Sequence, residues 1–131
     1  MSSIVMYIIV NNDLSMGKGK IAGQCCHSSC NVIRILERNE KNSQIYNEWI
    51  KTGETKIVLK ATQLEMEKIF EEYQLSSKNS SFKNSSSKSI WCVCIHDAGR
   101  TQIPENSLTS IAFCPIIRSE TPEFIKNMKL L

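Results

Sequence analysis

The chain has 131 residues, of which 41% are apolar, and a formal net charge of +3 at neutral pH. This length suffices for one domain with a buried core, and the longest apolar run, at residues 4–10, is far shorter than the roughly 20 residues that cross a bilayer. The run also lacks the flanks of a signal peptide, so we expect a cytoplasmic protein without a membrane partner, whose six cysteines are reduced and buried.

The first half of the chain alternates between strand and helix patterns. Residues 4–10 are apolar and rich in β-branched side chains, which predicts a strand buried on both faces. Apolar residues then recur every three or four positions from about Gly19 to Arg38, which predicts a long helix. We expect its polar face to carry Lys20, Gln24, His27, Asn31, Arg34 and Arg38.

Three shorter elements follow toward the middle of the chain. Residues 43–51 predict a second helix, with Gly53 as its stop signal. Residues 55–61 predict the next strand. Thr62 with Glu65 three positions later is the pattern of a capping box, so a third helix should begin there.

The second half contains one segment that cannot contribute to a core. Residues 76–89 are almost entirely Ser, Lys and Asn, which predicts a flexible loop. Strands are predicted at 90–95 and 108–114. Pro122 should occupy the first position of a short last helix, and residues 129–131 form a possible terminal strand.

This order of elements indicates a single α/β domain over residues 1–131. Strands that alternate with helices are typical of a mainly parallel sheet with helices on both faces. Ligands of such sheets collect at the carboxyl ends of the strands. We therefore expect Asn11 to Asp13, Lys60, and His96 with Asp97 to border one pocket.

The turn after the first strand has the chemistry of an anion site. Lys18 and Lys20 alternate with Gly17 and Gly19 directly before the long helix. Backbone N–H groups and the helix dipole favour an anion at such a position, and the lysines add full charges. The spacing is not that of a Walker P-loop.

Several stretches together form a specific combination. They are Asn12-Asp13-Leu14, Met16-Gly17-Lys18-Gly19-Lys20, Gln24-Cys25 with His27, Lys56 to Lys60, Asp97-Ala98-Gly99-Arg100-Thr101-Gln102-Ile103, and Met128-Lys129-Leu130. With these stretches the sequence resembles the archaeal and eukaryotic type of peptidyl-tRNA hydrolase, often called the second family. The resemblance runs from about Met6 to the C-terminus and is interrupted at residues 74–89.

This resemblance implies a small α/β domain with a mixed four-stranded sheet, usually a homodimer. It also implies hydrolysis of the ester between a peptide and the terminal ribose of tRNA, with no metal and no cofactor. The substrate fits the anion site, because it carries phosphates beside an activated ester.

The resemblance also suggests roles for individual residues. Asp97 is the preferred base or water-orienting group, with His27 as its competitor. Lys18 would stabilise the oxyanion, and Thr101 would hydrogen-bond substrate or water. The residues expected to bind tRNA are Lys20, Gln24, Lys60 and Arg100, of which Lys20, Lys60 or Arg100 could instead hold Asp97 in place. Asn11 stands where members of the family often have arginine, so one phosphate contact is in question.

Three other interpretations are considered. A nucleophilic pair of Cys25 and His27 is disfavoured, because residues two apart on a helix point about 200° apart. A zinc site from Cys26, Cys30, Cys92 and Cys94 is conceivable, but the C-x-C spacing is atypical. A non-catalytic RNA- or protein-binding module on the same fold cannot be separated from the enzyme by helix and strand patterns.

Overall fold

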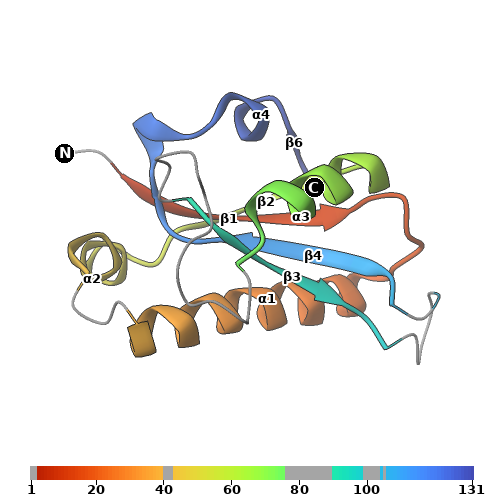
Figure 1. Ribbon diagram of the computed structural model, residues 1–131, viewed down its shortest axis with the longest axis horizontal. Helices are drawn as coiled ribbons and strands as arrows, with labels where there is room; N and C mark the ends of the chain where they lie inside the picture. The colour runs from red at the N-terminus through yellow and green to blue at the C-terminus, as the bar shows by residue number, and fades with distance from the viewer. Residues whose placement is uncertain (1–2, 40–42, 76–89, 99–103, 105) are drawn as a thin grey trace.

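A six-stranded sheet runs through the middle of the molecule and carries helices on both faces (Figure 1). The computed structural model describes residues 3–39, 43–75, 90–98, 104 and 106–131. The strands are β1 (Ile4–Asn11), β2 (Lys56–Ala61), β3 (Cys92–His96), β4 (Leu108–Phe113), β5 (Ile116–Ile117) and β6 (Lys129–Leu130). The helices are α1 (Lys18–Asn39), α2 (Gln44–Lys51), α3 (Gln63–Tyr73), α4 (Glu123–Lys126) and the 3-10 turn η1 (Arg118–Glu120).

The sheet is mixed, and most of its strand pairs are antiparallel. Its order is β3-β4-β1-β2-β6, with β5 pairing with the beginning of β1. The parallel pair is β1 with β2, whereas β4, β5 and β6 all pair antiparallel with their neighbours. The prediction of a mainly parallel, four-stranded sheet was therefore wrong, although a mixed α/β domain is confirmed.

The connections help to explain why β1 and β2 are the parallel neighbours in this sheet. A crossover through α1 and α2 joins β1 to β2, as parallel neighbours require. In contrast, β3 and the next strand along the chain, β4, pair antiparallel. The short β5, which the sequence did not reveal, continues in the direction of β4 after Pro115 and pairs antiparallel with the beginning of β1.

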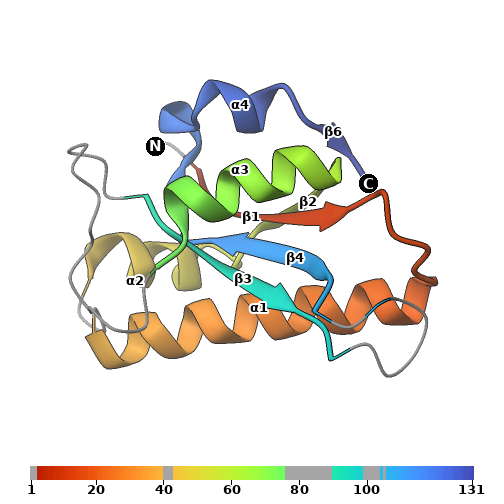
Figure 2. The ribbon, with the colours of Figure 1, turned by 45° about the vertical axis from the view of Figure 1, so that its right-hand side comes forward.

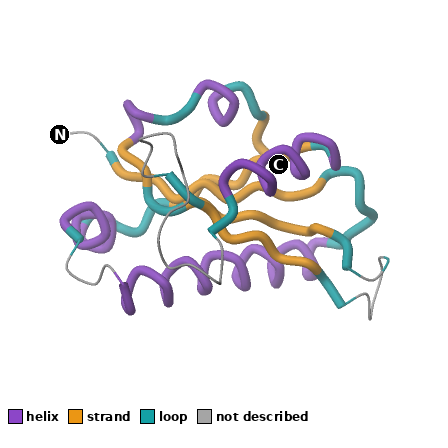
Figure 3. Tube along the Cα trace, viewed as in Figure 1, coloured by secondary structure: helices purple, strands orange, loops and turns teal. Residues whose placement is uncertain are grey.

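Helices cover the two faces of the sheet with separate sets of apolar side chains (Figures 2 and 3). On one face, α1 and α2 bury Val32, Leu36 and Trp49 against Met6 and Ile8 of β1. The opposite face packs against α3 and α4 through Met66, Ile69, Ile125 and Phe113, together with Ile9 of β1. Strand β1 is buried along its whole length, as its continuous apolar sequence predicts.

The local signals for helix ends are largely confirmed. Thr62 accepts from the backbone N–H of Glu65, and the Glu65 side chain accepts from the Thr62 backbone, so the capping box is formed. Gly53 has φ 108°, the left-handed conformation that ends α2 at low steric cost. Pro122 is the N-cap of α4 and not its first helical residue, so this helix begins one position later than predicted, at Glu123.

Other predictions need correction or lie outside the described residues. All six cysteines are free thiols, but Cys26 and Cys30 are exposed, so the prediction that the cysteines are buried was wrong for these two. The loop predicted at 76–89 lies outside the described residues. Among the helices described, none has the length and apolar character needed to cross a membrane.

Candidate active site

Three strands end at the same edge of the sheet. β1 and β2 are parallel, and β1 and β3 each pair antiparallel with β4, so β1, β2 and β3 run in one direction. Their carboxyl ends place Asn11, Lys60 and Asp97 along one edge, at which the N-terminus of α1 also lies (Figure 2). The predicted convergence of these segments on one edge is confirmed.

An ion pair joins the long helix to the end of β3 at this edge. Lys20 Nζ lies 2.8 Å from Asp97 Oδ1, and the two side chains are 15% and 12% exposed. The backbone of Asp97 is held as well, because its N–H donates to Ser107 and its carbonyl accepts from Asn106. These contacts hold the Asp97 carboxylate in one position, with the ammonium group of Lys20 beside it.

Gln24 fastens α1 to the sheet one turn after Lys20. Its side-chain oxygen accepts from the hydroxyl of Thr109, and its carbonyl accepts from Ser110 Oγ at 2.8 Å. Both hydroxyls can reach the helix because Thr109 is an extra residue in β4, where the register with β3 shifts. Lys20 and Gln24 therefore contact the sheet rather than lying on a fully solvated face, as the sequence had suggested.

The remaining predicted residues are not all gathered at this ion pair. Lys18 and His27 are exposed on α1, and neither has a hydrogen-bond or ion-pair partner among the described residues. Thr101 and Arg100 lie outside the described residues. The structure thus joins Lys20, Gln24 and Asp97, and it leaves His27 on the solvent side of the helix.

Lys60 lies on the same edge and lines a cavity of its own. This cavity has a volume of about 260 Å³, and its described lining includes neither Lys20 nor Asp97. Lys129, Asn127 and Asn12 line it together with Lys60. The single pocket expected to contain all three segments is therefore not confirmed.

Asn11 supports the edge from inside the protein, a role that the sequence analysis missed. Its amide nitrogen donates to Gln63 Oε1 and to the carbonyl of Leu108, and its oxygen accepts from the N–H of Asp13. The carboxylate of Asp13 in turn accepts from the N–H of Gln63, the first residue of α3. A polar side chain at the end of a wholly apolar strand was the available signal, because buried amides need partners.

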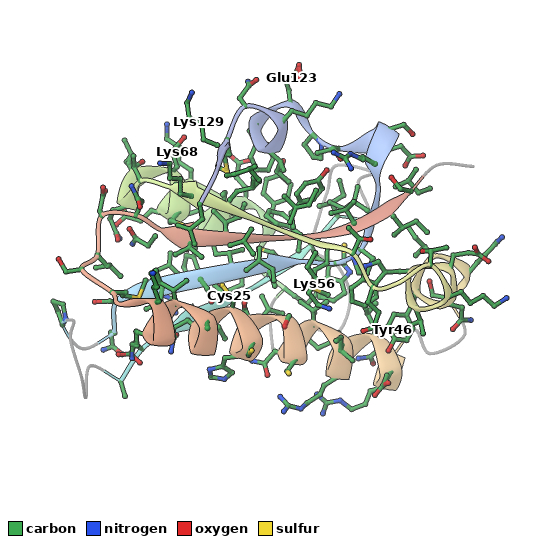
Figure 4. The ribbon with its side chains drawn as sticks, turned by 180° about the vertical axis from the view of Figure 1, so that it is seen from behind. Cys25, Tyr46, Lys56, Lys68, Glu123 and Lys129 are labelled. Atoms are coloured by element: carbon green, nitrogen blue, oxygen red, sulfur yellow. The ribbon has the colours of Figure 1, made fainter. Side chains whose placement is uncertain are left out.

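The cysteines do not form the alternative sites considered from the sequence. Burial, and secondarily the neighbouring Cys26, raises the pKa of the Cys25 thiol, which opposes formation of a nucleophilic thiolate. Figure 4 shows Cys25 on the side of α1 that faces the sheet, whereas His27 is exposed. Among the residues described, no group of three His, Cys, Asp or Glu side chains is placed to hold a metal ion.

Comparison with known proteins shows which sequences this chain is similar to. Residues 4–131 match the family described as peptidyl-tRNA hydrolase PTH2. A peptidyl-tRNA hydrolase of Methanococcus maripaludis strain C7 is 34% identical over 125 residues, which are 95% of this chain and 96% of the relative. Those of Methanocaldococcus jannaschii and of Saccharolobus islandicus strain L.S.2.15 are 30% and 32% identical over 96% and 98% of this chain, and 98% and 99% of the relatives.

Proposed function

The chain belongs to the peptidyl-tRNA hydrolase PTH2 family, and on this basis we propose that the Lys20–Asp97 pair is the centre of its active site. The protein is a hydrolase that cleaves peptidyl-tRNA. The observation that carries the proposal is the 2.8 Å contact of Lys20 with a mostly buried aspartate at the carboxyl edge of the sheet. No other ion pair with both partners so little exposed occurs among the described residues.

Ester hydrolysis defines what these groups have to do. A water molecule attacks the carbonyl carbon of the peptidyl ester while a base takes its proton, and negative charge develops on the carbonyl oxygen. Collapse of this intermediate breaks the bond to the ribose oxygen, which leaves with a proton. Peptide with a free carboxyl group and tRNA with a free hydroxyl group are released.

Asp97 is suited to orient or deprotonate this water. Its backbone is fixed by Ser107 and Asn106, and Lys20 holds its carboxylate, so little reorganisation is needed at the moment of reaction. Lys20 acts as a positioning residue in this scheme. Gln24 acts on Asp97 indirectly. Its hydrogen bonds to Thr109 and Ser110 hold the helix that carries Lys20.

Charged groups nearby are assigned to the oxyanion and to the phosphates. Lys18 is exposed in the first turn of α1, where the helix dipole adds to its charge, so it can meet the oxyanion or a terminal phosphate. Arg100 and Thr101 follow Asp97 closely in sequence, which supports phosphate binding by the former and hydrogen bonding to substrate or water by the latter. We further propose that the reaction needs no metal or cofactor, that the enzyme is cytoplasmic, and that it is a homodimer.

The decisive experiment compares Asp97→Asn with His27→Ala in release of peptide from N-acetylaminoacyl-tRNA. Asparagine keeps the size of the side chain but cannot accept the proton, so kcat should fall about 10²- to 10⁴-fold. His27→Ala should retain nearly the full rate, because the imidazole is exposed and has no partner among the described residues. Activity of the wild type should survive a chelator.

Two Lys20 variants test the positioning role. Lys20→Arg retains a cation that can reach Asp97, whereas Lys20→Met keeps only the apolar stem. We expect partial rescue of kcat by arginine and a large loss with methionine, with KM changed less than kcat in both. If His27→Ala abolished turnover while Asp97→Asn preserved it, the assignment of Asp97 would be refuted and His27 would take the role of base.

A further inference from the structure

Two lysines face each other across the last pair of strands. In the antiparallel register of β2 and β6, Lys60 lies directly opposite Lys129. Like charges in directly opposite positions destabilise a sheet. Such a pair in a strand of two residues needs a compensating interaction.

The described part of the protein does not supply that compensation. Its ion pairs are Lys20 with Asp97 and Lys56 with Glu54, so neither Lys60 nor Lys129 is paired with a carboxylate there. Glu65 does line the same cavity, but one of its oxygens accepts from the backbone and hydroxyl of Thr62 in the capping box. That oxygen is therefore engaged at the start of α3.

The cavity beside these lysines is open to solvent and combines apolar surface from Ala61 and Met128 with several polar side chains. Besides Lys60, Lys129 and Glu65, its lining includes Asn12, Thr62 and Asn127, which can supply further hydrogen-bond donors. Figure 4 shows Lys129 at the same end of the molecule as Lys68 of α3. Two ammonium groups beside amide donors are the chemistry that recognises a phosphate.

This cavity is well separated from the Lys20–Asp97 pair. Four strand spacings lie between β3 and β6, which corresponds to about 19 Å at the usual separation of about 4.8 Å. A single terminal nucleotide that is bound at Asp97 cannot also fill the cavity at Lys129. A longer nucleic acid that follows the carboxyl edge of the sheet can do so.

We propose that Lys60 and Lys129 bind a backbone phosphate of the tRNA acceptor arm, beyond the nucleotide whose ester is cleaved. The inference rests on the proposed function, because the direction of the tRNA is set by the reacting ester at Asp97. It adds Lys129, together with Asn12 and Asn127, to the substrate-binding surface. The positive charges at β2 and β6 are stabilised when the phosphate is bound.

The test compares two substrates of different length. One is full-length N-acetylaminoacyl-tRNA, and the other is the N-acetylaminoacyl ester of adenosine, which has no phosphodiester. Lys129→Ala should raise KM for the tRNA about tenfold at low salt with little change in kcat, because a charge-assisted hydrogen bond is lost. The slope of log(kcat/KM) against log salt should fall by about 0.7 to 0.9 for each phosphate contact removed. Turnover of the adenosine ester should stay at the wild-type value.

Two further variants serve as control and counter-test. Lys51→Ala removes the same charge from α2, which lies toward the other end of the molecule, and it should leave both substrates unaffected (Figure 4). Glu65→Gln keeps a capping box, since glutamine also serves at this position, but it removes the one carboxylate in the described lining. It should lower KM for tRNA and not for the adenosine ester.

The inference would be overturned if Lys129→Ala and Lys51→Ala had equal effects on tRNA, which would indicate only general charge. It would also be overturned if Lys129→Ala impaired both substrates alike, or neither. Each of these results leaves the role of Asp97 intact. Retention of full activity by Asp97→Asn would instead contradict the proposed active site, whatever Lys129 does.

Discussion

Asn11 illustrates how much one buried side chain can decide. It is 1% exposed at the end of β1, and its amide connects this strand to α3, to the start of β4 and to the turn before α1. At this edge of the sheet α1 begins, β2 ends at Ala61 and β3 ends just before Asp97. The residue stands where members of the family often have arginine, and its side chain is engaged by Gln63, Leu108 and Asp13.

We expect Asn11→Leu to be strongly destabilising. Leucine has nearly the same size but leaves the carbonyl of Leu108 and the N–H of Asp13 without this partner, and each unsatisfied buried group costs about 1–3 kcal/mol. The free energy of unfolding in urea should fall by about 3 kcal/mol. The exposed neighbour gives the matched control, since Asn12→Leu should change it by less than about 0.5 kcal/mol. Equal stability of the two variants would refute the structural role of Asn11.

At the scale of elements, the position of α1 depends on its docking to β4. The extra residue at Thr109 turns two consecutive hydroxyls toward the helix, where they meet the side chain and the carbonyl of Gln24. Ser28 and Ser29 are also buried in this interface, and each satisfies its hydroxyl on a carbonyl of its own helix. The helix is thereby held at the angle that brings Lys20 to Asp97.

Thr109→Val tests this docking. Valine preserves the shape but loses the hydrogen bonds to Gln24 and to the carbonyl of Ile95, so the free energy of unfolding should fall by about 1–3 kcal/mol. Because Lys20 is one turn from Gln24, kcat should decrease several-fold while KM for the adenosine ester changes little. Ser29→Ala removes a hydroxyl that bonds only within α1, and should leave kcat unchanged. A normal kcat for Thr109→Val in folded protein would contradict the coupling.

At the scale of the whole molecule, the basic side chains are more informative than the net charge. A formal charge of +3 is small for an RNA-binding protein, yet Lys18, Lys20, Lys60 and Lys129 all lie on elements that meet at the carboxyl edge of the sheet. One long edge can therefore follow a nucleic acid while the rest of the surface remains mixed in charge.

The proposed homodimer can be tested directly. The chain has a mass of 14.9 kDa, so equilibrium sedimentation should yield about twice that value at the concentrations used for kinetics. A stable dimer would keep the doubled mass on dilution through the micromolar range. A mass that stayed at 14.9 kDa at every concentration would refute the homodimer without affecting the proposed catalytic roles.

The sequence by itself determined the elements and the chemistry that they carry. Continuous apolar residues predicted β1, helical periodicity predicted α1, and Thr62 with Glu65 marked the start of α3, because these signals are local and depend on residues within one or two turns. The glycine-lysine turn and the segment at Asp97 indicated the family, which the comparisons confirm.

Only the tertiary structure decided how these elements pair and which side chains meet. Strand direction depends on contacts between distant segments, so the antiparallel β4, β5 and β6 could not be read from alternation of strands and helices. Periodicity gave α1 a polar face but not its rotation against the sheet, which a bulge at Thr109 sets and which brings Lys20 to Asp97. The opposition of Lys60 and Lys129 likewise exists only in the register of β2 with β6, because residues 69 positions apart have no local signal in common.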